Sequence, residues 1–227
     1  DSPDERGLEE GLLYNPKYFT VTGSQAVPLI LYESDGVTRD YTRDILVVGG
    51  EYDGDPMYIM VNHWPSRSGG EAASAPYRNA AALMCKNLSD SLRAENPAAK
   101  IVIMGDLNDD PTSDSVDEVL AAQGKKNKVR KGGFYNPMWA FFRKGMGTTA
   151  YRDAWSLFDQ LIISDNWLDE KQEGYRFYQA YIFNPNYMVQ KSGHFLGYPY
   201  RTFAGDTYLG GYSDHFPVFM AIIKPTR

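Results

Sequence analysis

The sequence is short of cysteine, of long apolar runs and of basic residues, and each shortage narrows what the protein can be. Its single cysteine, Cys85, excludes an internal disulfide and lies in a helix-like segment that predicts a buried side chain. No apolar run approaches membrane-spanning length, and no signal peptide begins at Asp1. The net charge of −6 argues against a broad basic face for nucleic acid, but it is compatible with a phosphate substrate.

What is present is the composition of a globular domain. The chain has 227 residues, of which 43% are hydrophobic and 23% charged, so we interpret residues 1–227 as one domain with one core. Tyrosine is the most abundant aromatic residue, which favours strands over a helical bundle. The chain begins with aspartate rather than methionine, which indicates a removed beginning. An upstream signal peptide would make the protein secreted or envelope-bound, and without one it would be cytoplasmic. Localisation and oligomeric state stay open.

The stretch Ile101–Pro111 (IVIMGDLNDDP) carries the clearest functional signal. Four apolar residues predict a buried strand that ends at Gly105, and a carboxylate and a carboxamide follow at Asp106 and Asn108. If strand geometry continues past the glycine, the two side chains project to the same side. Such a pair suits a hard cation and a phosphate oxygen. An acidic turn is an equally good interpretation of this stretch alone.

A strand, a long helix and a second strand predict a βαβ unit around this stretch. The segments are Met57–Asn62, Ala72–Glu95 and Ile101–Met104. Apolar residues recur along the helix at Ala80, Ala81, Met84, Cys85, Leu88 and Leu92, which fits one buried face. Strands are also predicted at Leu12–Tyr14, Tyr18–Val21, Val27–Leu31, Tyr41–Val48, Leu161–Ile163 and Val218–Ile223, with a hairpin turn at Asp53–Asp55.

Three further segments have weaker patterns of secondary structure. Ser113–Ala122 fits a short helix, and the aromatic segment Phe134–Arg143 is also interpreted as a helix. Gly124–Gly133 carries five basic residues without an interleaved aromatic residue, so we interpret it as a solvated loop rather than a nucleic-acid contact.

Four polar signals lie at the edges of the predicted strands: His63, Asp106 with Asn108, Asp159, and Asp214 with His215. Two of the three histidines belong to this set. Strand ends of one sheet system can converge on a single cleft, so we expect these side chains to meet. Neighbouring residues of a strand point apart, but in a turn Asp214 could hold another histidine while His215 meets the substrate.

In this arrangement the sequence resembles the endonuclease/exonuclease/phosphatase family of metal-dependent phosphoesterases. The matching segments, in the family's order, are VNHWPS (Val61–Ser66), IVIMGDLNDDP (Ile101–Pro111), FDQLII (Phe158–Ile163) and SDHFPV (Ser213–Val218). Thr42-Arg43-Asp44 matches the family's Arg-acidic strand less closely. The segment Arg6–Tyr14 is similar to a bacterial branch of the family.

The resemblance implies a four-layer α/β sandwich of the DNase I type and in-line hydrolysis of a phosphoester by water with Mg²⁺ or Mn²⁺. His215, oriented by Asp159, would be the general base or the electrostatic partner of the water. Asp106 and Asn108 would position the water and a phosphate oxygen. The remaining implied roles are a metal ligand at Asp214, a phosphate contact or leaving-group acid at His63, and a phosphate clamp at Arg43.

One departure from the family pattern is large. Family members begin with a strand that carries an asparagine and continue to a strand whose glutamate is the main metal ligand, and Asp1 aligns after both. We expect that about a third of the usual domain lies upstream, in preference to a natural chain that lost its metal site. The substrate stays open between nucleic acid, a phospholipid headgroup and a phosphorylated small molecule.

Two other functions stay open. A non-catalytic binding or structural module would keep the fold without a complete metal site. A domain that binds carbohydrate or a lipid surface would use exposed tyrosines of Tyr175–Tyr200, although an aromatic-rich packed insertion is the favoured interpretation of that segment.

Overall fold

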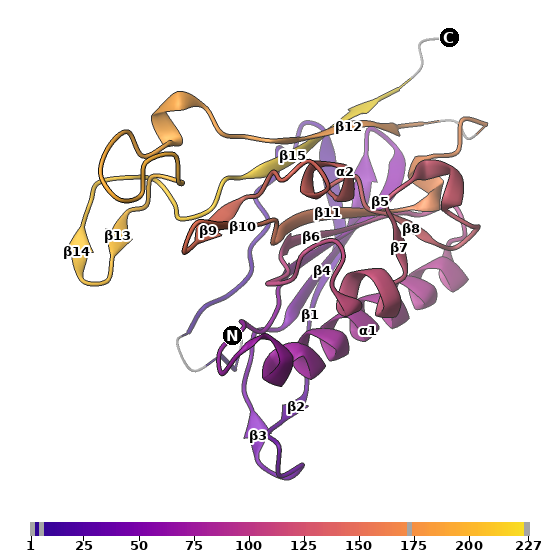
Figure 1. Cartoon of the computed structure of the whole chain (residues 1–227). Helices are drawn as coiled ribbons and strands as arrows, with labels where there is room; N and C mark the ends of the chain where they lie inside the picture. The colour runs from indigo at the N-terminus through magenta and orange to yellow at the C-terminus, as the bar shows by residue number, and fades with distance from the viewer. Residues whose placement is uncertain (1–2, 5–6, 172–173, 225–227) are drawn as a thin grey trace.

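A seven-stranded sheet organises the computed structural model, which describes residues 3–4, 7–171 and 174–224 (Figure 1). Its strand order is β1-β4-β5-β6-β11-β8-β7. The bounds are β1 (Phe19–Val27), β4 (Ile45–Tyr52), β5 (Asp55–His63), β6 (Lys100–Asp106), β11 (Asp159–Ser164), β8 (Phe134–Tyr135) and β7 (Ala122–Gln123). Strands β1, β4 and β5 are successive antiparallel neighbours, whereas β5 and β6 are parallel.

Helix α1 (Glu71–Glu95) connects the parallel pair and covers one face of the sheet (Figure 1). Ala81 and Cys85 are fully buried in the cluster that this helix forms with β5 and β6. The predicted βαβ unit and the predicted apolar face of the helix are therefore confirmed. A buried apolar stripe of this kind supplies most of a helix's stability, because isolated helices are marginal in water.

The other face of the sheet packs against a two-stranded ribbon of β12 (Arg176–Ile182) and β15 (Val218–Ile223). Phe177 and Ala180 of the ribbon are buried in a second apolar cluster with Val102 and Ile163 of the sheet. Helix, sheet and ribbon thus form successive layers, and the predicted α/β sandwich of the DNase I type is confirmed. None of the described helices is long and apolar enough to span a membrane.

The remaining elements are short. They are β2 (Leu31–Tyr32), β3 (Arg39–Asp40), β9 (Thr149–Tyr151), β10 (Ala154–Ser156), β13 (Phe203–Ala204), β14 (Thr207–Tyr208), α2 (Trp139–Phe142), the π-helix Ser115–Val119, and 3₁₀ turns at Lys126–Lys128, Asp165–Trp167 and Asn186–Met188. Between β12 and β15, residues 183–217 leave the sandwich as an excursion that carries β13 and β14 (Figure 1).

Several predicted boundaries are wrong. Residues Leu12–Tyr14 form no strand, and Arg6, in the same family motif, lies outside the described residues. Strand β4 starts at Ile45 rather than Tyr41 and runs through Gly49 and Gly50, because both glycines pack under the rings of Tyr58 and Phe19. A turn at Asp53 and Gly54, both with positive φ, closes the predicted hairpin.

Two predicted helices and one strand are also wrong in part. Ser113–Ala122 forms only a single π-turn, in which the Leu120 amide reaches the Ser115 carbonyl, before Ala122 pairs in β7. Phe134–Arg143 divides into β8 and the one-turn helix α2. The predicted strand Val27–Leu31 is interrupted, since β1 ends at Val27 and β2 starts at Leu31.

Only glycine fits at position 105 of β6, next to the backbone of β5. The φ of Gly105 is +133°, and a Cβ placed there would lie 1.8 Å from the carbonyl oxygen of Asn62 on the neighbouring strand. Only glycine satisfies both the backbone conformation and the close approach of β5 to β6. The strand end that carries Asp106 therefore depends on this residue.

We predict that Gly105→Ala lowers the free energy of unfolding by more than about 3 kcal/mol, because backbone strain and a main-chain clash combine. Chemical denaturation of the variant and the wild type measures this loss. Gly36→Ala, with φ of +69° and open space around it, should cost only about 1 kcal/mol. A loss at Gly105 no larger than that at Gly36 would contradict the prediction.

Candidate active site

Three neighbouring strands bring the predicted site residues together at one edge of the sheet. His63 at the end of β5 pairs in register with Asp106 at the end of β6, and Asp106 pairs with Asp159 at the start of β11. Strands β5 and β6 are parallel, and β11 is antiparallel to β6. The carboxyl ends of β5 and β6 therefore lie beside the amino end of β11. The predicted convergence of His63, Asp106 and Asp159 is confirmed.

The carboxylate of Asp106 lies between two histidines. Its Oδ2 is 3.5 Å from Nε2 of His63 and 3.9 Å from Nδ1 of His215. The same Nδ1 forms a hydrogen bond of 2.7 Å with Oδ2 of Asp159. His63 is the most open member of the group, with 40% of its side chain exposed, against 24% for His215. A ligand from solvent therefore reaches both imidazoles.

The carboxylates set the charge of His215. Burial alone would lower the pKa of this imidazole, but the hydrogen bond to Asp159 and the charges of Asp159, Asp106 and Asp214 raise it to about 9. Burial raises the pKa of Asp106, against the opposing effect of the His215 charge. His215 is consequently a cation at neutral pH, held against two carboxylates.

Asn108 is close to Asp106, but not in the way that the sequence predicts. Strand β6 ends at Asp106, and Asn108 adopts a φ of +51°. Its backbone amide donates to Oδ1 of Asp106 at 2.9 Å, and its Nδ2 donates to the carbonyl of Trp64 at 2.9 Å. The same-side expectation is wrong, because a turn rather than an extended strand brings the two residues together. The side chain of Asn108 binds the loop that follows His63.

Two threonines that no sequence pattern indicates hold the loop that carries His215. The hydroxyl of Thr149 donates to the carbonyl of Asp214, and the amide of Phe216 donates to the carbonyl of Thr148. Thr148 Oγ1 also accepts from the amide of Asp159 at 3.3 Å. These contacts join the excursion to the start of β11. Threonines before a short strand are common, so no local pattern distinguishes them.

Asp214, the predicted metal ligand, is exposed beside His215. Its charge contributes to the raised pKa of that histidine. Among the described residues, no three histidine, cysteine, aspartate or glutamate side chains are arranged to hold a metal ion. The described donor set therefore does not fit a metal centre by itself, since Asp106 and Asp159 are already engaged by the histidines.

Arg43, the predicted phosphate clamp, is buried and faces acidic groups. It is 4% exposed and lies 3.4 Å from Asp4 and 3.4 Å from Glu10, while its Nε donates to the carbonyl of His63. Burial raises the pKa of Glu10 to about 7, although the Arg43 charge opposes this. The clamp role stays a prediction: Arg43 supports the backbone at His63, and its charge also acts on the Asp106 carboxylate.

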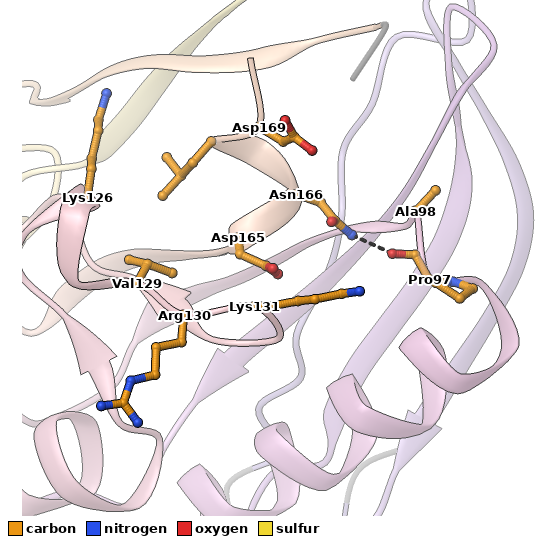
Figure 2. A pocket seen from close by; sticks show the side chains of 10 residues that line it. Pro97, Ala98, Lys126, Val129, Arg130, Lys131, Asp165, Asn166 and Asp169 are labelled. Atoms are coloured by element: carbon orange, nitrogen blue, oxygen red, sulfur yellow. Dashed lines mark hydrogen bonds between the residues drawn. The ribbon is translucent and has the colours of Figure 1, made fainter. Parts of the chain in front are cut away.

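A pocket of about 730 Å³ at the far end of the sheet is lined in part by the basic loop (Figure 2). Its side chains do not form a catalytic site. It lies near Asp165, which follows β11 and is separated from Asp159 by about 20 Å of strand. Lys126 and Arg130 extend in opposite directions in Figure 2, and Asn166 donates to the Pro97 carbonyl. Its polar groups do not converge on one point.

An α/β sandwich whose sheet edge carries two histidines and two interleaved carboxylates defines a phosphoesterase-type hydrolase. The family model described as "Endonuclease/Exonuclease/phosphatase family" matches residues 1–224. The chain belongs to this family. A comparison with curated proteins finds no match.

Solved structures share the fold at low sequence identity. A humanized Danio rerio TDP2 is 12% identical with a TM-score of 0.55, and the alignment covers 92% of this chain and 69% of that one. D. rerio TDP2 complexed with a single-strand DNA product is 12% identical with a TM-score of 0.53, covering 92% and 70%. A mannosyl-6-phosphatase of Bacteroides thetaiotaomicron is 14% identical with a TM-score of 0.53, covering 92% and 69%.

The raised pKa of His215 makes stability depend on pH. The charged pair with Asp159 stabilises the fold fully below pH 6.5, and this contribution is lost as pH rises through about 9. We predict that the free energy of unfolding falls between pH 6.5 and 9 by roughly 1 to 3 kcal/mol more in the wild type than in His215→Gln. Urea denaturation at several pH values measures the difference. His194→Gln, in the exposed excursion, is the matched control, and parallel curves for wild type and His215→Gln would refute the prediction.

Proposed function

We propose that the protein hydrolyses a phosphoester by in-line attack of water, and that a phosphodiester, as in a phosphodiesterase or nuclease, is the favoured substrate. The observation that carries the proposal is the cationic His215, which Asp159 holds next to Asp106 and His63. A phosphoryl group gains charge on its non-bridging oxygens in the transition state. A fixed imidazolium stabilises that charge more than it stabilises the ground state.

The chain's residues divide the work as follows. His215 with its raised pKa acts as the electrostatic partner of the phosphoryl oxygens rather than as a neutral base. His63, which is open to solvent, contacts the phosphate or gives a proton to the leaving oxygen. Asp106 orients the attacking water, and its raised pKa makes it a better proton acceptor than an ordinary aspartate. Asn108 fixes the turn that holds Asp106 in place.

We also propose that hydrolysis requires Mg²⁺ or Mn²⁺, because the family resemblance implies a divalent cation with Asp214 among its ligands. The cation would neutralise charge on the phosphate. The described residues do not assemble a site for this cation unaided. We propose in addition that the chain belongs to a bacterial branch of the family, to which the segment Arg6–Tyr14 is similar.

Hydrolysis of bis(4-nitrophenyl) phosphate in the presence of excess Mg²⁺ tests the proposal. We predict metal-dependent release of nitrophenol that exceeds the release from the monoester. His215→Ala should lose at least about 100-fold in rate, because the cation at the phosphoryl oxygens is gone. Addition of EDTA should abolish the activity.

The control for this loss is His194→Ala, since His194 is exposed in the excursion, where its ring contacts Phe195. Its rate should equal that of the wild type. Full activity in His215→Ala would refute the assignment of the site. An inactive wild type that still binds phosphate or a phosphodiester would favour the second candidate function, a binding module that retains the fold.

A further inference from the structure

One arginine outside the predicted site residues contacts the loop that carries Asp106 and Asn108. Arg67 donates from Nε to the carbonyl of Asn108 at 2.9 Å. Its Nη2 lies 3.2 Å from Asp109 and 3.4 Å from Asp110. Charge-assisted contacts of a planar guanidinium are directional as well as strong, so Arg67 fixes the course of this loop.

The same guanidinium lies against the segment that leads into Asp159. Its central carbon is 4.6 Å from the centroid of the Phe158 ring. The carbonyl of Phe158 accepts a hydrogen bond of 2.8 Å from the amide of Leu107, between Asp106 and Asn108. Arg67 therefore covers the place where the Asp106 loop and the start of β11 are joined.

Arg67 itself belongs to the loop that follows His63. Its Nη1 pairs with Glu71 in the first turn of α1 at 3.2 Å. Through this anchor the guanidinium connects the His63 loop, the Asp106 loop and the segment that carries Asp159. All three of its nitrogens are engaged by protein groups, which leaves no fork for a phosphate.

We propose that Arg67 is the positioning residue of the site, which holds these three segments in the arrangement that keeps Asp106 between His63 and His215. The proposal rests on the proposed function for its catalytic consequence. It does not require Arg67 to touch the substrate. Arg67 contacts each of the three segments at a point outside the strands. The sheet hydrogen bonds do not fix the segments at these points, so the arginine does.

The surroundings of Asp109 make the proposal testable in a folded protein. Arg78, which is fully buried, lies 2.8 Å from Oδ1 of Asp109, and Ser115 donates to Oδ2 of the same carboxylate. Removal of Arg67 therefore leaves Asp109 paired. Removal of Arg78 would strand a buried charge, which is strongly destabilising, so Arg67 is the residue to substitute.

Arg93 is a matched control. It pairs with Asp90 at 3.2 Å, donates to the carbonyl of Gly133 and lies 4.6 Å from the Phe134 ring centroid. These contacts have the same chemistry as those of Arg67, but they lie on the far part of the sheet. Arg93→Ala measures the general cost of losing a stacked and paired arginine.

The first measurement is the NMR titration of the histidine rings in wild type, Arg67→Ala and Arg93→Ala. The chain has only three histidines, so the imidazole signals are readily assigned. In Arg67→Ala the pKa of His215 should move away from about 9, since the carboxylates around it lose their fixed places. In Arg93→Ala it should stay unchanged. An unchanged value in a folded Arg67→Ala variant would overturn the proposal.

The second measurement is hydrolysis of bis(4-nitrophenyl) phosphate. Arg67→Ala should lower kcat by about 10- to 100-fold with little change in KM, and guanidinium ion in the assay should restore part of it. Arg67→Lys should fall between, because it keeps the charge but loses the planar fork. A loss of activity in Arg67→Ala that comes from KM alone would contradict the positioning role. An equal loss of kcat in Arg93→Ala would contradict it as well. An inactive wild type would refute the proposed function alone, since the titration decides on Arg67 independently.

Discussion

The structure of the site depends on one carboxylate that serves two histidines. Asp106 ends a buried strand, and its oxygen faces His63 on one side and His215 on the other. A buried carboxylate is costly unless cations or donors surround it. Asp106 is stabilised by His215 and by the amide of Asn108, so the negative charge and the geometry of the loop support each other.

The arginines of the site act on the backbone rather than on the open side. Arg43 donates to the carbonyl of His63, and Arg67 donates to the carbonyl of Asn108. Both guanidinium groups also pair with acidic side chains, Arg43 with Asp4 and Arg67 with Asp109. The positive charge that faces a ligand is therefore that of His215, whose raised pKa depends on Asp159. A protein of net charge −6 can in this way present a local cation to a phosphate.

Much of this arrangement was predictable from the sequence. The βαβ unit and the meeting of His63, Asp106 and Asp159 followed from apolar strands that end in polar residues. The contacts of Arg43 and Arg67 were not predictable, because both join segments distant in the chain. The course of Asn108 was mispredicted for a different reason: a backbone with positive φ replaced the extended strand. Patterns of two or three residues do not encode such a turn or a partner some forty residues away.

The excursion of residues 183–217 has a consequence for the order in which the site is completed. Asp159 joins the sheet, but its partner His215 follows 56 residues later, after the chain has left the sandwich and returned. The sheet and α1 precede that return in the chain, whereas His215 lies just before β15, which pairs with β12. A single cut by a protease between residues 183 and 214 would leave His215 on one fragment with β15, whose Val218, Met220 and Ile222 pack in the second apolar cluster. In the cut protein, the pairing and packing of β15 alone would hold His215 beside Asp159.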